Sequence, residues 1–181
     1  MTKRTIFGAI VASLAVAGYG CIHAQQAKKF TLEDYREIQN LYYTYAYSID
    51  AGQGDVLAST FVEDGEFTHG YGPGQADTVR NPVKGLEALK RVGSTSGTRH
   101  FVANLLITPT TEGAKGSCYL LLYSARTTPP SFVETAIYDD TLVKTSHGWK
   151  FKKRVVWRDD DDITPFKPKP LPSDGENRTA P

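Results

Sequence analysis

Residues 31–52 read TLEDYREIQNLYYTYAYSIDAG, and the apolar side chains in this stretch recur every three or four positions. That spacing places them on one face of an amphipathic helix. Thr31 and Asp34 have the spacing of a capping box, and Gly52 follows the last periodic residue as a stop signal. The stretch therefore predicts a first and longest helix with one face toward a core. The residues of that face are Leu32, Tyr35, Ile38, Tyr42, Tyr45 and Ile49.

The rest of the chain continues with two short helical patterns and then with strands. Residues 56–61 follow the cap residue Asp55, and residues 82–92 follow Asn81, which predicts a second and a third helix. From residue 98 onward the apolar period changes to two, which is typical of strands. Helices followed by long strands predict an α+β domain, with a curved antiparallel sheet packed on about three N-terminal helices. The expected strands cover residues 66–69, 98–108, 117–127, 132–144 and 149–158.

The first 24 residues have the layout of a secretory signal peptide. Lys3 and Arg4 precede an apolar run over residues 6–17, and small and polar residues follow up to Ala24. The run is shorter than the roughly 18 residues that a membrane-spanning helix needs, so no membrane span is expected. We predict cleavage after Ala24 and export to the periplasm or the medium, with residues 28–158 forming the folded domain.

The two cysteines leave one alternative open for the amino terminus. Cys21 stands where a bacterial lipoprotein carries its acylated cysteine, although residues 18–20 lack the large apolar residue that such sites usually begin with. A lipoprotein anchored at Cys21 is therefore the alternative to plain cleavage. Cys118 lies in an apolar run, so no disulfide is expected within the mature domain. At the other end, residues 159–181 are first acidic and then rich in Pro and Lys, which predicts a disordered tail.

Charge and motifs exclude several classes of function. The chain has 21 Lys and Arg against 20 Asp and Glu, a formal net charge of +1, which becomes −1 on removal of Lys3 and Arg4. Such a balance offers no basic surface for nucleic acid. The glycines of residues 70–74 lack the Lys and Ser/Thr of a phosphate-binding loop, which argues against a nucleotide cofactor. The histidines lack the close spacing of metal ligands, so neither a metal nor another cofactor is expected.

Asp50 and His100 are the residues in which we expect chemistry. Asp50 directly follows the apolar face of the first helix, where the helix dipole disfavours an anion by about 0.3–1 kcal/mol. Its alternative role is to bind backbone groups at the helix end. His100 begins a strand on whose more polar face we also expect Val102, Asn104 and Leu106. An imidazole hydrogen-bonded to a carboxylate transfers protons near neutral pH, so the two would form a general acid–base pair; taken alone, His100 could equally be structural.

Three short motifs carry a family resemblance. They are YAYSID at residues 45–50, TRHFVAN at residues 98–104 and HGWKF at residues 147–151. Together they resemble the SnoaL-like branch of the nuclear-transport-factor-2-like superfamily, and the resemblance covers roughly residues 31–158. It implies a cone-shaped α+β domain that encloses a pocket for an apolar small molecule.

Within this branch, the scytalone and bile acid dehydratases and the hexachlorocyclohexane dehydrochlorinase share an Asp–His pair inside the cone. The resemblance therefore implies catalytic roles for Asp50 and His100. Similarity to the bile acid dehydratase implies catalytic roles also for Tyr45, five residues before Asp50, and for Arg158 on the last strand. Tyr45 could equally be a core aromatic, and Arg158 could pair with the neighbouring aspartates. The sequence departs from that dehydratase at residues 120–122, which are leucines where it places another carboxylate on a middle strand.

These expectations define a pocket and a class of reaction. Asn104, Tyr138 and Trp157 are expected to contact the substrate, whereas Arg154 is expected to face solvent. We predict a cofactor-independent acid–base lyase or isomerase of the dehydratase type, whose partner is an apolar small molecule. The alternative is a non-catalytic exported binding protein of the same fold. Self-association into a homo-oligomer remains open.

Overall fold

The computed structural model describes residues 30–70, 80–94 and 96–159. The predicted signal peptide, the alternative lipid anchor at Cys21 and the predicted tail beyond Asp159 lie outside these ranges. Within them, no helix is long and apolar enough to cross a membrane.

Three helices precede or interrupt the first strands, as the sequence predicts. They are α1 (Leu32–Asp50), α2 (Gly54–Ser59) and α3 (Leu86–Val92). The capping box forms at the start of α1: the Thr31 side chain accepts a hydrogen bond from the main-chain N–H of Asp34, and the Asp34 carboxylate accepts one from the main-chain N–H of Thr31. These two bonds satisfy main-chain donors that a helix start leaves open, which fixes where α1 begins.

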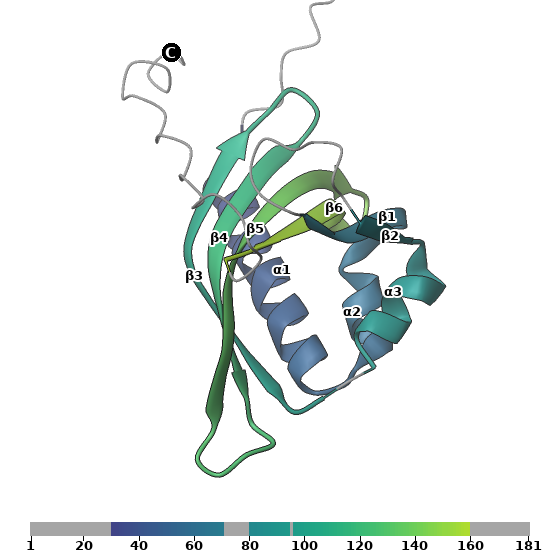
Figure 1. Cartoon of the computed structure of the whole chain (residues 1–181). Coiled ribbons are helices and arrows are strands. Elements are labelled where there is room, and N and C mark those ends of the chain that lie inside the picture. Colours follow the sequence, from purple (N-terminus) through teal and green to yellow (C-terminus); the bar gives the residue numbers. More distant parts are fainter. Residues whose placement is uncertain (1–29, 71–79, 95, 160–181) are drawn as a thin grey trace, which may run out of the picture.

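Six strands form one curved sheet that wraps around α1 (Figure 1). Their order across the sheet is β2-β1-β6-β5-β4-β3. All neighbours are antiparallel except β1 and β6, which are parallel; most of the chain separates these two, so no hairpin constrains their directions. The α+β class and the helix-covered sheet are confirmed, and the sheet is mixed. The strands are β1 (Phe61–Gly70), β2 (Arg80–Lys84), β3 (Thr98–Pro109), β4 (Ala114–Ser124), β5 (Ser131–Thr145) and β6 (Gly148–Arg158).

The third helix is shorter than the sequence predicts. It begins at Leu86, because the residues before it form β2. Val83, which has helical spacing relative to Leu86, instead pairs with Phe67 of β1 and packs against the core. Gly85 then takes a φ of 80°, which ends the strand and admits the new direction. The expected helix start at residue 82 is therefore wrong, because the periodicity of Val83 serves the sheet.

The core lies between α1 and the concave face of the sheet. Edge-to-face contacts join Tyr42 and Tyr45 of α1 to Phe151 of β6, at ring-centroid distances of 5.2 and 5.9 Å. Cys118 of β4 is a free cysteine with only 3% of its surface exposed. The part of the α1 stripe from Ile38 to Tyr45 thus packs on the concave face, whereas Leu32 and Tyr35, which were expected there, are 85% and 41% exposed. The same cluster includes Ile38, Leu41, Leu57, Leu89, Leu120 and Leu142.

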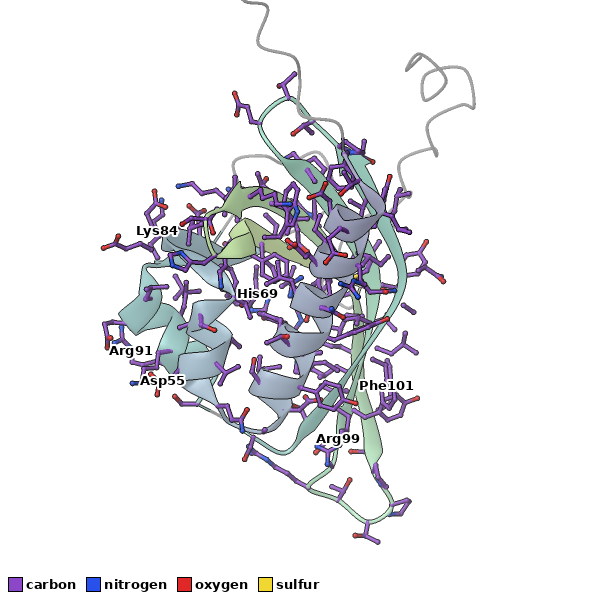
Figure 2. The ribbon with its side chains drawn as sticks, turned by 180° about the vertical axis from the view of Figure 1, so that it is seen from behind. Asp55, His69, Lys84, Arg91, Arg99 and Phe101 are labelled. Carbon is purple, nitrogen blue, oxygen red and sulfur yellow. The ribbon has the colours of Figure 1, made fainter. Side chains whose placement is uncertain are left out.

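The convex face of the sheet carries exposed aromatic side chains. Phe101 and Phe132 are each 55% exposed, and the ring of Tyr123 lies 5.8 Å from both. Figure 2 shows Phe101 on the outer side of β3, away from the helices. Because this outer patch is apolar, the polar side chains enclosed by the concave face are the candidates for a functional site.

Two irregularities in strand pairing decide which side chains enter the concave face. On β3 the register shifts between Ala103 and Leu106, and Asn104 adopts a φ of 57°. The extra residue reverses the alternation, so that Leu105 packs toward the core while Asn104 and Leu106 are exposed. The expectation that these two share the face of His100 is wrong for this reason.

The second irregularity lies on β6 and turns an arginine inward. Phe151 pairs with Leu142 and Lys153 pairs with Thr141, so β6 contains one residue more than β5 at this point. The alternation reverses there, and Arg154 is fully buried rather than solvent-facing. The expected exposure of Arg154 is therefore wrong.

Candidate functional site

The structure brings Asp50, the last residue of α1, against His100 near the start of β3. The Oδ1 atom of Asp50 lies 2.6 Å from Nδ1 of His100, and its Oδ2 atom accepts the main-chain N–H of His100 at 3.0 Å. Thr98 Oγ1 donates to the same Oδ1 at 3.1 Å. Only 14% of the Asp50 side chain and 8% of the His100 side chain are exposed. The carboxylate is therefore held by three groups of one strand.

The chain between these two elements explains their approach. Ala51, just beyond α1, forms an isolated bridge with Ser96, just before β3. Gly52 follows with a φ of 70°, a conformation that favours glycine and turns the chain away from the helix axis. The end of α1 is thus joined to the entry of β3, and the dyad lies at that junction.

The hydrogen bonding of the dyad fixes the state of the imidazole. An ionised carboxylate only accepts hydrogen bonds, so Nδ1 of His100 carries the proton and Nε2 keeps a lone pair. Burial lowers the pKa of His100 below its ordinary value of 6.5, although Asp50 opposes this shift. His100 is therefore neutral at pH 7 and able to accept a proton at Nε2.

Tyr45 and Tyr138 lie in the aromatic core of the cone. Their rings are 6.1 Å apart in an edge-to-face arrangement, and each is 4.1 Å from the guanidinium carbon of Arg154. Burial raises the pKa of Tyr45, so its hydroxyl stays protonated and keeps a proton to donate. Among the described residues, the hydrogen bonds of the dyad come from β3 and not from Tyr45. The core reading of Tyr45 is thus supported, and its hydroxyl remains a candidate donor.

Arg154 forms a buried ion pair that the sequence did not reveal. Its Nε and Nη2 atoms donate to the two carboxylate oxygens of Asp140 at 2.8 and 2.7 Å, and the Tyr42 hydroxyl also donates to Asp140. Both charged side chains are fully buried. Nη1 has no hydrogen-bond partner within the described residues, but four aromatic rings surround the guanidinium and their faces attract its charge. In the sequence, Arg154 is a charged residue among apolar neighbours on β6. Its inward direction can be inferred only when the bulge is known.

Arg158 pairs with a carboxylate that the sequence analysis missed. It forms an ion pair with Glu134 across β5 and β6. Glu134 is only 7% exposed, and it pairs in register with Leu122 of β4, which in turn pairs with His100 of β3. Glu134 alternates along β5 with the buried Ala136, a period of two that could have indicated its inward direction.

Asn104 and Trp157 are not brought to the dyad. Asn104 is exposed at the bulge of β3. Trp157 neighbours Arg158 along β6, so its side chain lies on the opposite face of the sheet. There its ring covers Gly70 so closely that a Cβ at that glycine would come within 2.3 Å of it.

A cleft of about 540 Å³ lies elsewhere, beside the turn that joins β3 to β4. It is lined by both apolar and charged side chains, among them Ala114, Lys115, Asp64 and Lys152. None of its lining residues belongs to the dyad. It therefore differs from the expected apolar pocket, and the chemistry of the dyad is the better guide to the site.

Comparison with known proteins places this arrangement in a family. The profile of the SnoaL-like domain matches residues 31–155. Among curated protein sequences, none matches this chain.

Solved structures show the same fold. A Mycobacterium tuberculosis protein of unknown function, Rv3472, is 23% identical over 70% of this chain and 72% of its own, with a TM-score of 0.61. A Catenulispora acidiphila protein in complex with S-DNPA is 25% identical over 71% and 96%, with a TM-score of 0.59. A Novosphingobium aromaticivorans protein that bears the name of a scytalone dehydratase is 26% identical over 78% and 96%, with a TM-score of 0.56. The curved sheet around α1 and the matched profile together show that this chain belongs to the SnoaL-like domain family.

Proposed function

We propose that this protein is a cofactor-independent acid–base lyase of the dehydratase type, which acts on an apolar small molecule with His100 as its base. The observation that carries the proposal is the 2.6 Å hydrogen bond between Asp50 and Nδ1 of His100, because it leaves Nε2 as a proton acceptor. The likeness to a protein named for scytalone dehydratase supports the same class of reaction. The signal-like start of the sequence supports an exported location.

In the proposed reaction, Nε2 of His100 removes a proton from a carbon next to an activating group such as a carbonyl. The electron pair of that C–H bond becomes a C=C bond, and a hydroxyl on the adjacent carbon leaves. The imidazolium returns its proton to the departing hydroxyl, so that water is the second product. Asp50 positions the ring and stabilises its charged form, while Tyr45 donates a hydrogen bond to the carbonyl oxygen on which negative charge develops. Arg158 was the other expected donor, but it lies on β6, three strands from His100 of β3, and pairs there with Glu134.

The test begins with a screen of hydroxylated and halogenated ring compounds for thermal stabilisation of the protein, followed by an assay of the binders for elimination. We expect His100→Ala to lower the rate by roughly 10²- to 10⁴-fold, because the general base acts in the transition state. Binding of the same compounds should persist. Normal turnover by this variant contradicts the mechanism, and loss of its fold indicates a structural role. Tight binding without turnover by either protein favours the non-catalytic binding protein.

The pH dependence gives a second readout. Because burial lowers the pKa of His100 below its ordinary value of 6.5, the rate should fall to half its maximum at a pH below 6.5, as the base becomes protonated. An NMR titration measures the same pKa without any substrate. Asp50→Asn should lower it further, since Asp50 favours the protonated ring. A histidine that titrates at or above 6.5 in the wild-type protein would count against the proposal.

A further inference from the structure

A row of three side chains crosses the concave face from the dyad toward β6. His100 of β3 pairs with Leu122 of β4, and Leu122 pairs with Glu134 of β5. Directly paired residues project to the same face of a sheet. Strands are about 4.8 Å apart, so the main chains of His100 and Glu134 are separated by roughly 10 Å, with a leucine between them. A base, an apolar stretch and a carboxylate therefore follow one another along this row.

The far end of the row is an ion pair rather than an isolated charge. Glu134 pairs with Arg158 of β6, and 8% and 35% of their side chains are exposed. The pair is electrically neutral, yet it presents both an acceptor and a donor. A hydroxyl group can donate to the Glu134 carboxylate and accept from the guanidinium at once. A ligand carboxylate would instead meet the negative charge of Glu134, which disfavours it.

We propose that Glu134 and Arg158 form a second polar subsite, which binds a hydroxyl group of the apolar ligand about two strand spacings from the base. The proposal rests on the proposed function, since it takes His100 to mark the reacting end of the same ligand. Leu122 contacts the apolar body between the two ends. The substrate class is thus an elongated apolar compound with a neutral hydroxyl at the end remote from the reacting carbon.

Three rod-shaped probes test this subsite: 4-phenylphenol, biphenyl and 4-phenylbenzoate, which differ only in the group at one end. Calorimetric or fluorescence titration should show that the wild-type protein binds 4-phenylphenol roughly tenfold or more tightly than biphenyl, the gain expected for a hydrogen bond to a charged group. 4-Phenylbenzoate should bind more weakly than 4-phenylphenol. Equal affinity for biphenyl and 4-phenylphenol, or a preference for the benzoate, overturns the proposal.

Glu134→Gln should reverse this preference. It removes the anion but leaves Arg158, so affinity for 4-phenylphenol should fall roughly tenfold while affinity for 4-phenylbenzoate rises. Affinity for biphenyl should not change. Glu87→Gln, which alters an exposed carboxylate on α3, serves as the matched control and should leave all three affinities unaltered. An unchanged hydroxyl preference in Glu134→Gln contradicts the subsite.

Two further measurements separate this inference from the proposed function and from a failure to fold. His100→Ala should retain the preference for 4-phenylphenol, so the subsite can hold even if His100 proves not to be a base. If Glu134→Gln does not fold, NMR of the wild-type protein replaces it. The Arg158 side-chain N–H resonance should then shift on addition of 4-phenylphenol and not on addition of biphenyl. Equal shifts with both probes contradict the proposal.

Discussion

At the scale of single residues, Arg154 and Asp140 illustrate how a buried charge is retained. Burial alone would lower the pKa of Arg154, but the adjacent Asp140 raises it well above its ordinary value. The pair keeps both charges because two hydrogen bonds, the Tyr42 hydroxyl and four aromatic rings replace the water that each charge loses. Neither residue touches the dyad through a hydrogen bond in the described part of the chain, so we assign the pair a structural role.

Replacing one member of the Arg154–Asp140 pair should lower the free energy of unfolding more than replacing both. Arg154→Met and Asp140→Leu should each lower the free energy of unfolding by about 3–5 kcal/mol, because each leaves an uncompensated buried charge. The double variant should recover much of that loss, since an apolar pair of similar volume has no charge to desolvate. Urea denaturation of the four proteins measures this as a double-mutant cycle. Additive losses in the double variant would show that the two charges do not compensate each other.

The positions of Asp50 and His100 could be predicted from the sequence, and the family resemblance implied that they pair. Asp50 and His100 lie at the end of a periodic helix and the start of a strand, positions that local patterns reveal. Glu134 shares the period of two of Ala136, a signal that was overlooked, whereas the direction of Arg154 depends on the alternation at one point of β6. A bulge reverses that alternation without a clear signal in composition, so Arg154 was expected on the wrong face.

At the scale of elements, the start of α1 is fastened to the strands by Asp34. Its Oδ1 atom accepts the indole N–H of Trp149 at 2.9 Å and lies 2.5 Å from Nζ of Lys144. Burial would raise the pKa of Asp34, but the hydrogen bonds from Lys144, Trp149 and Thr31 outweigh it and hold the pKa well below its ordinary range. The capping carboxylate thus joins the first helix to β5 and β6.

This arrangement predicts an acid-sensitive helix anchor. Asp34→Ala should lower the free energy of unfolding at pH 7 by about 1–3 kcal/mol, because it leaves the buried Trp149 N–H without its acceptor. The depressed pKa stabilises the fold above about pH 4, where an unfolded Asp is ionised, and this contribution is lost as the pH falls further. The difference between wild type and variant should therefore shrink from pH 7 to pH 3. Asp55→Ala, at an exposed site on α2, is the control; an equal effect at both pH values contradicts the assignment.

The order of helices and strands was predictable because each kind of element has a distinct apolar period. Which strands pair with each other was not predictable in this way. Residues 98–158 alternate over long stretches, and the four strands found there agree closely with those expected. Val83 shows the limit of this approach. One apolar residue fits both a helical and a strand period, and only pairing with β1 decides between them.

At the scale of the whole molecule, a single curved sheet separates two chemically different faces. The concave face encloses the dyad and two ion pairs, and the convex face exposes the rings of Phe101 and Phe132. Export and cleavage near Ala24 concern residues outside the described ranges, so they stay predictions, as does self-association. The packing of α1 on the sheet buries the core cluster, which includes Cys118.

The labelling rate of the buried Cys118 thiol measures how often this core opens. Burial raises the pKa of its thiol to about 12, so the reactive thiolate forms only when the sheet opens. In a Cys21→Ser background, an aromatic disulfide reagent should therefore modify the native protein at a rate set by opening, and urea should accelerate it in step with global unfolding. A thiol introduced by Thr111→Cys in the exposed turn between β3 and β4 should react at once. Fast labelling of Cys118 without denaturant would instead show that the sheet opens locally in the native protein. The decrease in the labelling rate on addition of a ligand would then measure how strongly the ligand suppresses this opening.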